Sequence, residues 1–498
     1  MSASDQERSE VYTTRPPGPQ ESSRDLAGRL EAWAAGARAR RLIRALRRAG
    51  VGGAWLVGGT VRDLALGRAP EPPDLDLAVT DRAAEAAGRI AEALGGSPFV
   101  LDEEREAWRV ALEGGGTVDV IPLRAPTIRE DLAGRDFTVN ALAWDLLGPG
   151  ALLDPLGGLA DLADRVLRLC RPLALEEDPV RVLRAYRFSV ALGLRPAEGL
   201  GPLMARAARG LPRAAPERVR TELFLTLGLP GGAGALRRMH AHGVLEALFP
   251  FVTGWRGFDQ GDYHSYDLLE HSLRAAEEAQ RLAATGQGLP GPGRLREHLS
   301  EELEQGITRG ALLVLAAFLH DLAKPECAAV EGERRRFIGH EVRGGHLLRK
   351  LLEGLRVGRR ARGAAQRVVA AHLRLFQLAR QSPATGRARL RYLRDLRSEV
   401  PEALILSLAD ERATGPEPPS LEAVERTAAE VLALYWRKRD QREIPPLIRG
   451  RDLVERLGVP PGPRVGALLR AVEEAEARGE VATPNEALAL ARRLIRGP

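Results

Sequence analysis

The chain has 498 residues, 44% of them hydrophobic, so it is too long for one core and is expected to form several domains. No apolar run reaches the roughly 20 residues of a membrane-spanning helix, and no charged-apolar-small leader is present. Its two cysteines form neither a metal-binding spacing nor a disulfide framework. These features argue against a membrane protein and favour the reducing cytoplasm, while the net charge of +6 is compatible with a polyanionic partner.

Residues 1–49 precede the first predicted strand. Residues 1–25 are polar and lack periodicity, so they are expected to be disordered. Residues 26–49 carry apolar side chains at helical spacing, which predicts one amphipathic helix.

Two adjacent glycines then follow a short apolar segment. Residues 51–57 are a predicted strand, and Gly58 and Gly59 end it and let a ligand approach the backbone. The helix that follows would favour an anion at its N-terminus. Asp74 and Asp76 lie two apart in a second predicted strand, so their side chains share one face. Alone, either signal would fit a turn or a solvated acidic strand, but together they suit Mg²⁺ held between the protein and nucleotide phosphates.

This stretch resembles the nucleotidyltransferase head of the bacterial class II tRNA nucleotidyltransferases (CCA-adding enzymes) and poly(A) polymerases. The resemblance extends from about residue 26 to residue 498. It implies that Asp74 and Asp76 hold catalytic Mg²⁺. It also implies that the triphosphate site is shaped by Gly58, Gly59, Arg62 and Asp63.

The rest of the head is predicted to alternate between helix and strand. Residues 82–94 fit a helix, and residues 99–101, 108–112 and 117–122 fit strands. Asp119 lies in the last strand between two valines. Its carboxylate either faces solvent or is the third catalytic carboxylate, near the primer hydroxyl.

A second family motif, Arg-Asp-Phe-Thr-x-Asn-Ala, lies within residues 130–142. The resemblance implies contacts from Arg135, Asp136 and Asn140 to the triphosphate or ribose. Capping of a helix by Asp136 or Thr138 is an alternative that could coexist with this role.

A third motif, Glu-Asp-x-x-Arg, opens a predicted helix at residues 177–188, with Asp178 as its cap. In the family it pairs with the Watson–Crick edge of the incoming base. Arg181 would donate to ring acceptors and Asp178 would accept from the exocyclic amine that C and A carry. Arg218 is expected to brace the motif. The basic face of the helix consists of Arg181, Arg184 and Arg187.

Histidines gather between residues 264 and 372, and their order resembles the HD phosphohydrolase superfamily. Adjacent His-Asp with a distant His and Asp can hold one divalent transition metal, and further histidines a second. A chance His-Asp pair at a helix end is the simpler alternative, and the resemblance supports the fold more strongly than retained hydrolysis. The implied metal ligands are His271, His320, Asp321, His340, His372 and Asp410.

The expected fold class is α+β, with a small mixed α/β head followed by helical domains. The expected domains are a disordered segment (1–25), the head (26–170), a helical neck that binds nucleotide and RNA (171–250), an HD domain (251–412), and a linker with a helical tail (413–498). The sequence does not define an oligomeric state.

The expected activity is extension of an RNA 3′ end, such as that of tRNA, from CTP and/or ATP. Two alternatives stay open: a poly(A) polymerase acting on general RNA, and an HD phosphohydrolase whose head only binds nucleotide or RNA. A non-catalytic RNA-binding protein would need the carboxylates to be structural.

One segment bears on specificity. In this family a flexible loop usually follows the strand of the third carboxylate and helps to refit the pocket from C to A. Here only residues 125–129 separate Arg124 from Glu130, and Pro126 stiffens them. We therefore expect restricted activity, adding either CC or the terminal A. Alternatively, a loop near residues 103–108 provides the movement.

Overall fold

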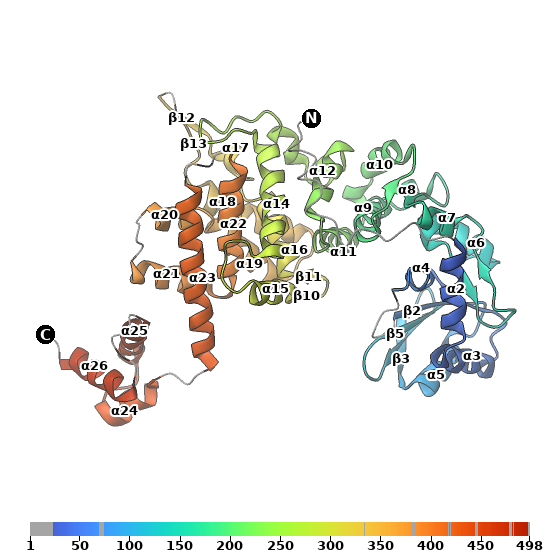
Figure 1. The fold of residues 1–498 in the computed structure, drawn as a ribbon, viewed down its shortest axis with the longest axis horizontal. Helices are drawn as coiled ribbons and strands as arrows, with labels where there is room; N and C mark the ends of the chain where they lie inside the picture. Colours follow the sequence, from blue (N-terminus) through green and yellow to red (C-terminus); the bar gives the residue numbers. More distant parts are fainter. Residues whose placement is uncertain are drawn as a thin grey trace. The chain divides into compact units, whose positions relative to one another are not determined.

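The computed structural model describes residues 23–68, 74–332, 334–380, 385–416, 418, 420–443, 447–477, 481 and 483–496. Of the segment expected to be disordered, residues 1–22 lie outside the described residues. Helix α2 begins at Ser23, so the last three residues of that segment are helical. The chain divides into two compact units, Met1–Pro250 and Phe251–Pro498 (Figure 1). No described helix is long and apolar enough to cross a membrane.

The segment predicted as one N-terminal helix forms two, α2 (Ser23–Ala34) and α3 (Ala37–Ala49). The prediction was wrong at Gly36, which adopts an extended backbone (φ −72°, ψ 159°) and is the N-cap of α3. Apolar periodicity continues across this break, so the sequence pattern could not reveal it. Helix α3 then packs against α5 (Ala83–Leu94).

A seven-stranded sheet forms the head, in the order β3-β4-β5-β2-β1-β6-β7. Strands β2 and β5 are parallel, and the other neighbours are antiparallel. The bounds are β1 Ala54–Val57, β2 Asp74–Val79, β3 Gly96–Asp102, β4 Ala107–Leu112, β5 Thr117–Pro122, β6 Ala143–Asp145 and β7 Leu152–Leu153. The strands predicted around residues 99, 108 and 117 are confirmed.

The sheet has one apolar face and one polar face in its centre. Leu75, Leu77, Val118 and Val120 alternate with the acidic residues and are buried. Helix α5 packs against β3, β4 and β5. Alternation therefore directs Asp74, Asp76 and Asp119 to the opposite face of the sheet. Two short helices border that region, α4 (Gly59–Ala65) and α6 (Ile128–Ala133).

Small helices follow the sheet within the same unit. The bounds are α7 Gly158–Ala163, α8 Ala174–Glu177, α9 Val180–Leu192, α10 Leu200–Ala208, α11 Pro216–Leu227, α12 Ala233–Ala241 and α13 Val244–Leu248. The last two of them, α12 and α13, are separated at Gly243, which takes a left-handed backbone (φ 67°). The predicted helix after Asp178 is confirmed as α9, which packs against α11, but its N-cap residue is Pro179 and not the predicted Asp178.

The second unit is mainly helical. Its centre is α14 (Leu268–Thr285), which packs against both α16 (Arg309–Phe318) and α22 (Val400–Ala413). Around it lie α15 Pro292–Ser300, α17 Lys324–Cys327, α18 His340–Gly354, α19 Arg359–Ala370, α20 Arg374–Arg380, α21 Gly386–Leu396 and α23 Leu421–Glu443. Short hairpins pair β10 (Glu302–Glu304) with β11 (Ile307–Thr308) and β12 (Ala329–Glu331) with β13 (Arg334–Arg336). The tail helices are α24 Gly450–Leu457, α25 Pro463–Ala477 and α26 Pro484–Arg496.

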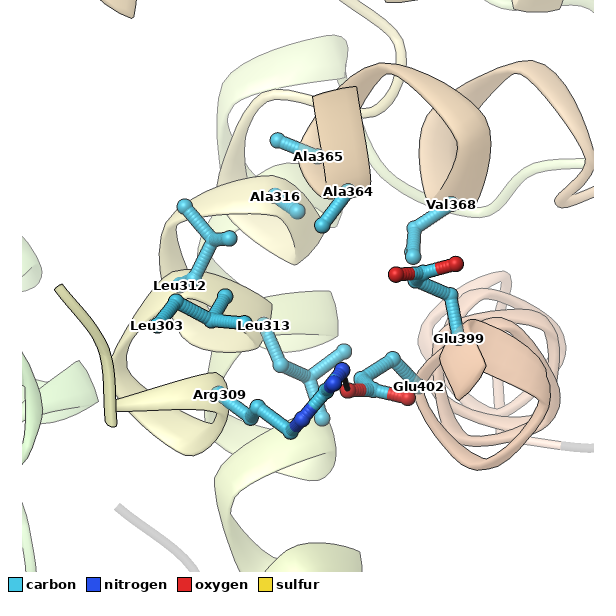
Figure 2. A pocket seen from close by; sticks show the side chains of 10 residues that line it. All are labelled: Leu303, Arg309, Leu312, Leu313, Ala316, Ala364, Ala365, Val368, Glu399 and Glu402. Atoms are coloured by element: carbon cyan, nitrogen blue, oxygen red, sulfur yellow. Dashed lines mark hydrogen bonds and ion pairs between the residues drawn. The ribbon is translucent and has the colours of Figure 1, made fainter. Parts of the chain in front are cut away.

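A cavity of about 10 Å³ lies between α16, α19 and α22 (Figure 2). Arg309 and Glu402 both reach it, and their side chains are 2.8 Å apart. A second carboxylate, Glu399, also lines it and pairs with Arg367. This space suits about one water molecule, and its charges are already paired, so it is a feature of the core.

Candidate functional site

The acidic residues of the head meet across two parallel strands. Asp76 on β2 lies directly opposite Asp119 on β5, and Asp74 opposite Thr117. The Thr117 hydroxyl donates to Asp74 Oδ1, and the Asp76 backbone N–H donates to the Thr60 hydroxyl at 2.9 Å. The predicted sharing of one face by Asp74 and Asp76 is confirmed by this register.

The charge of this cluster is poorly compensated at Asp76. Burial, together with the nearby carboxylates of Asp119 and Asp74, raises the pKa of Asp76 to about 6. A cation bound between the carboxylates would stabilise the charged form of Asp76 against both burial and the repulsion of its neighbours. Carboxylate oxygens without nitrogen or sulfur donors suit Mg²⁺, which is commonly bound by one or two carboxylates and substrate phosphates. The donor set at Asp74 and Asp76 therefore fits the predicted metal.

Asp119 differs from its neighbours because it already has a cationic partner. Arg109 on β4 lies directly opposite it in the register, and the two side chains form a bidentate ion pair. The hydrogen bonds that Arg109 donates to Asp119 raise the pKa of Arg109, although burial alone would lower it. Sequence reasoning missed Arg109 because nothing in the sequence indicates which residue faces Asp119.

The double glycine makes room for an arginine. Gly58 has φ +65° and ψ −130°, a conformation open to glycine but strained for other residues. A Cβ there would lie 2.7 Å from Nη1 of Arg135, whose guanidinium is held by Asp131 at 3.1 Å. Gly58 therefore sets the position of Arg135, whose charge acts on Asp76.

A basic cluster surrounds this arginine. Partial desolvation and the charges of Arg105, Arg135 and Arg181 lower the pKa of Arg124. The guanidinium groups of Arg105, Arg135 and Arg181 thus lie near that of Arg124, and the charge of Arg135 also acts on Asp76. Such an arrangement is suited to a polyphosphate. Sequence reasoning did not single out Arg105 and Arg124, which come from the β3–β4 turn and from the residue after Leu123.

Several residues predicted to touch nucleotide take part in a largely buried polar network. Arg62 donates to Asp63 at 2.8 Å and to Asn140, and Asn140 donates to Asp136 at 3.1 Å. Gly59, the other predicted glycine, begins α4 beneath Arg62.

The network continues into the helical part of the same unit. Arg184 on α9 donates to Asp136 at 2.7 Å and lies 3.3 Å from Glu222, which also binds Arg187 at 2.6 Å. Burial would raise the pKa of Asp136, but Arg184 and the surrounding hydrogen bonds lower it. Arg62, Asp136 and Arg184 therefore link α4 to α9 in this structure.

The predicted base-reading residues lie at the start of α9. Arg218 donates to Asp178 at 2.6 Å, which confirms the predicted bracing. Arg181 donates to the carbonyl groups of Gly134 and Arg135, both at 3.3 Å. The structure therefore brings Arg181 next to Arg135, within the basic cluster.

A second candidate centre lies in the other unit. Two groups of ligand atoms gather within 4.8 Å there: His271, His320, Asp321 and Asp410; and Asp321, His340 and His372. Asp321 belongs to both groups, so it could bridge two ions. The structure thus brings together the six residues predicted from the order of the motif.

Several buried atoms of this centre make no regular hydrogen bond among the described residues: both oxygens of Asp321 and Nε2 of His340 and His372. The oxygens of Asp321 nevertheless lie in close ionic contact with His320 Nε2 at 3.0 Å and His340 Nε2 at 3.1 Å. Burial would lower the pKa of His320, but the carboxylates of Asp321 and Asp410 raise it to about 10. Mixed nitrogen and oxygen donors with unsatisfied buried atoms fit a divalent metal ion.

Lys324 and His264 were missed as members of this centre. Lys324 Nζ lies 2.6 Å from Asp321 Oδ2 and 3.2 Å from His264 Nε2. The ring of His264 is 4.7 Å from that of His271. His346, by contrast, is exposed and contacts Gln366. The spacing of Lys324 three residues after Asp321 was the available signal, since it is one helical turn.

Family models match two segments of the chain. Residues 101–168 match the Poly A polymerase head domain, and residues 268–415 match the HD domain. The first contains β4 and β5, and the second contains all six candidate metal ligands of the second unit.

Curated proteins and solved structures are similar over most of the chain. The A-adding tRNA nucleotidyltransferase of Deinococcus radiodurans is 36% identical, covering 89% of this chain and 95% of that protein. The CC-adding tRNA nucleotidyltransferase of Geobacter sulfurreducens is 34% identical, covering 90% and 93%. The structure of the Thermotoga maritima CCA-adding enzyme complexed with tRNA has a TM-score of 0.61 at 22% identity, covering 94% and 97%.

Proposed function

The chain belongs to the tRNA nucleotidyltransferase family, and from this premise we propose that it adds C or A to the 3′ end of tRNA from CTP or ATP. The observation that carries the proposal is the pair Asp74 and Asp76 beside a cluster of arginines. The primer hydroxyl forms a bond to the α-phosphorus, the bond to the β-phosphate breaks, and pyrophosphate leaves.

The residues of the head divide the work of this reaction. Asp74 and Asp76 would hold Mg²⁺, which lowers the pKa of the attacking hydroxyl and offsets charge on the leaving group. Arg124 and Arg135 bind the triphosphate. Arg181 and Asp178 contact the base, and Arg218 fixes the carboxylate of Asp178. The buried residues Arg62, Asp136 and Asn140 and the half-buried Arg184 and Arg187 hold the triphosphate and base sites at a fixed separation.

The specificity is proposed to be restricted to one of the two steps. Strand β5 ends at Pro122 and α6 begins at Ile128. The connection is fixed at both ends: Leu123 N donates to Val79 O at 2.9 Å, and Arg124 N to Asp131 Oδ1 at 3.0 Å. Thr127 and Glu130 form a capping box at its other end. A pocket wall of this kind serves one base better than two.

The test uses two tRNA substrates, one ending at the discriminator base and one ending in CC. Each is incubated with CTP, ATP or both. Efficient extension of only one substrate is the expected result, and synthesis of the whole CCA end from the first would overturn restriction. Asp76→Asn is the inactive control. Preferential extension of unstructured RNA with many A residues would instead favour a poly(A) polymerase.

A second activity is supported by the metal-ligand geometry of the HD unit. The carboxylate of Asp321 belongs to both groups of clustered ligand atoms, and this arrangement fits a divalent transition metal; such centres carry out phosphoester hydrolysis. The expected activity is metal-dependent release of phosphate from a phosphoester. The test is the double variant His320→Ala and Asp321→Ala. It should lose phosphate release and keep nucleotide addition unchanged.

A further inference from the structure

The free edge of the head sheet is unusually apolar. Strand β3 is the terminal strand of the sheet, and Phe99, Val100 and Leu101 are 47%, 43% and 41% exposed. Proteins normally protect an edge strand with charges or prolines, because exposed apolar edges associate with other chains. Strand β3 contains such residues at Pro98 and Asp102, yet the three consecutive exposed apolar side chains between them call for a functional reason.

The register of the sheet gives Phe99 a defined position. Phe99 lies opposite Arg109, Arg109 opposite Asp119, and Asp119 opposite Asp76. Directly opposite residues point to the same face of a sheet, and the Arg109–Asp119 ion pair confirms this for the central pair. Phe99 therefore stands on the face of the catalytic carboxylates, whereas its neighbour Val100 points to the other face.

The distance along this row fits one nucleotide. Neighbouring strands are about 4.8 Å apart, so the backbone at Phe99 lies roughly 10 Å from that at Asp119. The primer places its 3′ hydroxyl at the carboxylates and extends its base away from them. An aromatic ring at this position lies within reach of that base.

The direction of attack also places the primer on this side. Gly58 and Arg135, the triphosphate side of the site, lie on the β1 side of Asp76. The attacking and leaving oxygens of phosphoryl transfer lie on opposite sides of the phosphorus. The primer hydroxyl therefore approaches from the β5–β4–β3 side.

We propose that Phe99 is a base-stacking residue for the 3′-terminal nucleotide of the RNA primer. The inference rests on the proposed function and adds the residue that holds the primer rather than the incoming nucleotide. Single-stranded RNA ends are commonly bound by stacking of bases on aromatic side chains. Arg109 supplies a positive charge beside this site, although its guanidinium is engaged by Asp119.

The experiment compares Phe99→Ala, Phe99→Leu and Phe99→Trp with Val100→Ala, a matched control of similar exposure on the other face. Loss of one base–aromatic stack should raise the KM for tRNA about tenfold in Phe99→Ala. The KM for the nucleotide should stay unchanged. Phe99→Leu should remain impaired and Phe99→Trp should be active, because stacking needs an aromatic ring.

A primer with an abasic 3′-terminal nucleotide tests the contact directly. Wild type and Phe99→Ala should use this primer equally poorly, since the stacking partner is already absent. Equal KM values of wild type, Phe99→Ala and Val100→Ala for normal tRNA would overturn the inference while leaving the proposed function intact. Pairing of two copies of the chain through β3 would also overturn the inference. It would appear in sedimentation as a dimer that Phe99→Ala dissociates. A wild type that extends no tRNA would refute the proposed function itself.

Discussion

Arg109 and Asp119 form a bidentate ion pair across β4 and β5, with Nε 2.6 Å from Oδ1 and Nη2 2.7 Å from Oδ2. This pair neutralises one carboxylate of the row that also contains Asp76. Asp119 therefore contributes less free negative charge to the metal site than its position suggests.

Arg109→Gln should move the pH dependence of nucleotide addition upward. Without the guanidinium, the charge of Asp119 acts on Asp76 uncompensated, and the midpoint should rise by about one pH unit. Initial rates between pH 5 and 9 measure this shift. Arg89→Gln, which removes an exposed arginine of α5 bound to Glu92, is the matched control and should leave the profile unchanged.

The wild-type enzyme should lose activity as the pH falls through about 6. Burial and the neighbouring carboxylates raise the pKa of Asp76 to about 6, so its protonated form, which cannot hold a metal, accumulates below that value. Protons and Mg²⁺ compete for the same carboxylate. Raising the Mg²⁺ concentration should therefore shift the midpoint to lower pH, and a midpoint independent of Mg²⁺ would contradict this assignment.

Gly58→Ala should impair both folding and nucleotide binding. An alanine would be strained at φ +65°, and its Cβ would lie 2.7 Å from Arg135 Nη1. We expect a free energy of unfolding lower by about 1–3 kcal/mol and a higher KM for the nucleotide. Gly88→Ala, on α5 with no atom within 4 Å of its Cβ, is the control and should not destabilise the protein. Normal nucleotide affinity in Gly58→Ala would refute the link to Arg135.

Removal of the HD ligands should separate metal binding from nucleotide addition. Mn²⁺ or Ni²⁺ should raise the Tm of the wild type, because the buried atoms of Asp321 and His372 gain a partner. His320→Ala combined with Asp321→Ala should abolish this rise and preserve nucleotide addition. His346→Ala, an exposed histidine outside the cluster, should behave as wild type. Collapse of nucleotide addition in the folded double variant would show that the two centres are coupled.

Arg181→Ala should change which base is chosen more than how tightly triphosphate is bound. Arg181 lies one helical turn after Asp178 and is held by the carbonyl groups of Gly134 and Arg135. Incorporation of all four nucleotides by the variant tests this role. A uniform decrease with unchanged selectivity would argue for a general phosphate contact instead.

A local pattern and a family motif were sufficient for two parts of the site. The spacing of Asp74 and Asp76 predicted a shared face, and the order of His271, His320, Asp321 and Asp410 predicted their convergence. Periodicity could not locate the break at Gly36, since a helix can continue through one glycine at modest cost.

Which residues face each other across neighbouring strands could not be predicted from the sequence. The pairing of Arg109 with Asp119 and the position of Phe99 depend on strand register, which tertiary packing decides. For the same reason, the sequence could not predict the hydrogen-bond partners of Asp136 and Asn140. Their motif was visible, but their burial against Arg62 and Arg184 arises from the packing of α9 near α4.

The polar network from Arg62 through Asn140 and Asp136 to Arg184 has a consequence for accuracy. In the proposed reaction no nucleic-acid template is read, so the choice of base depends on the separation between strand β2, which carries Asp74 and Asp76, and helix α9, which carries Arg181. Charged hydrogen bonds within this network, such as the partly buried one of 2.7 Å from Arg184 to Asp136, keep that separation constant. Substitutions that weaken this network should therefore increase the incorporation of wrong nucleotides before they lower the rate of nucleotide addition.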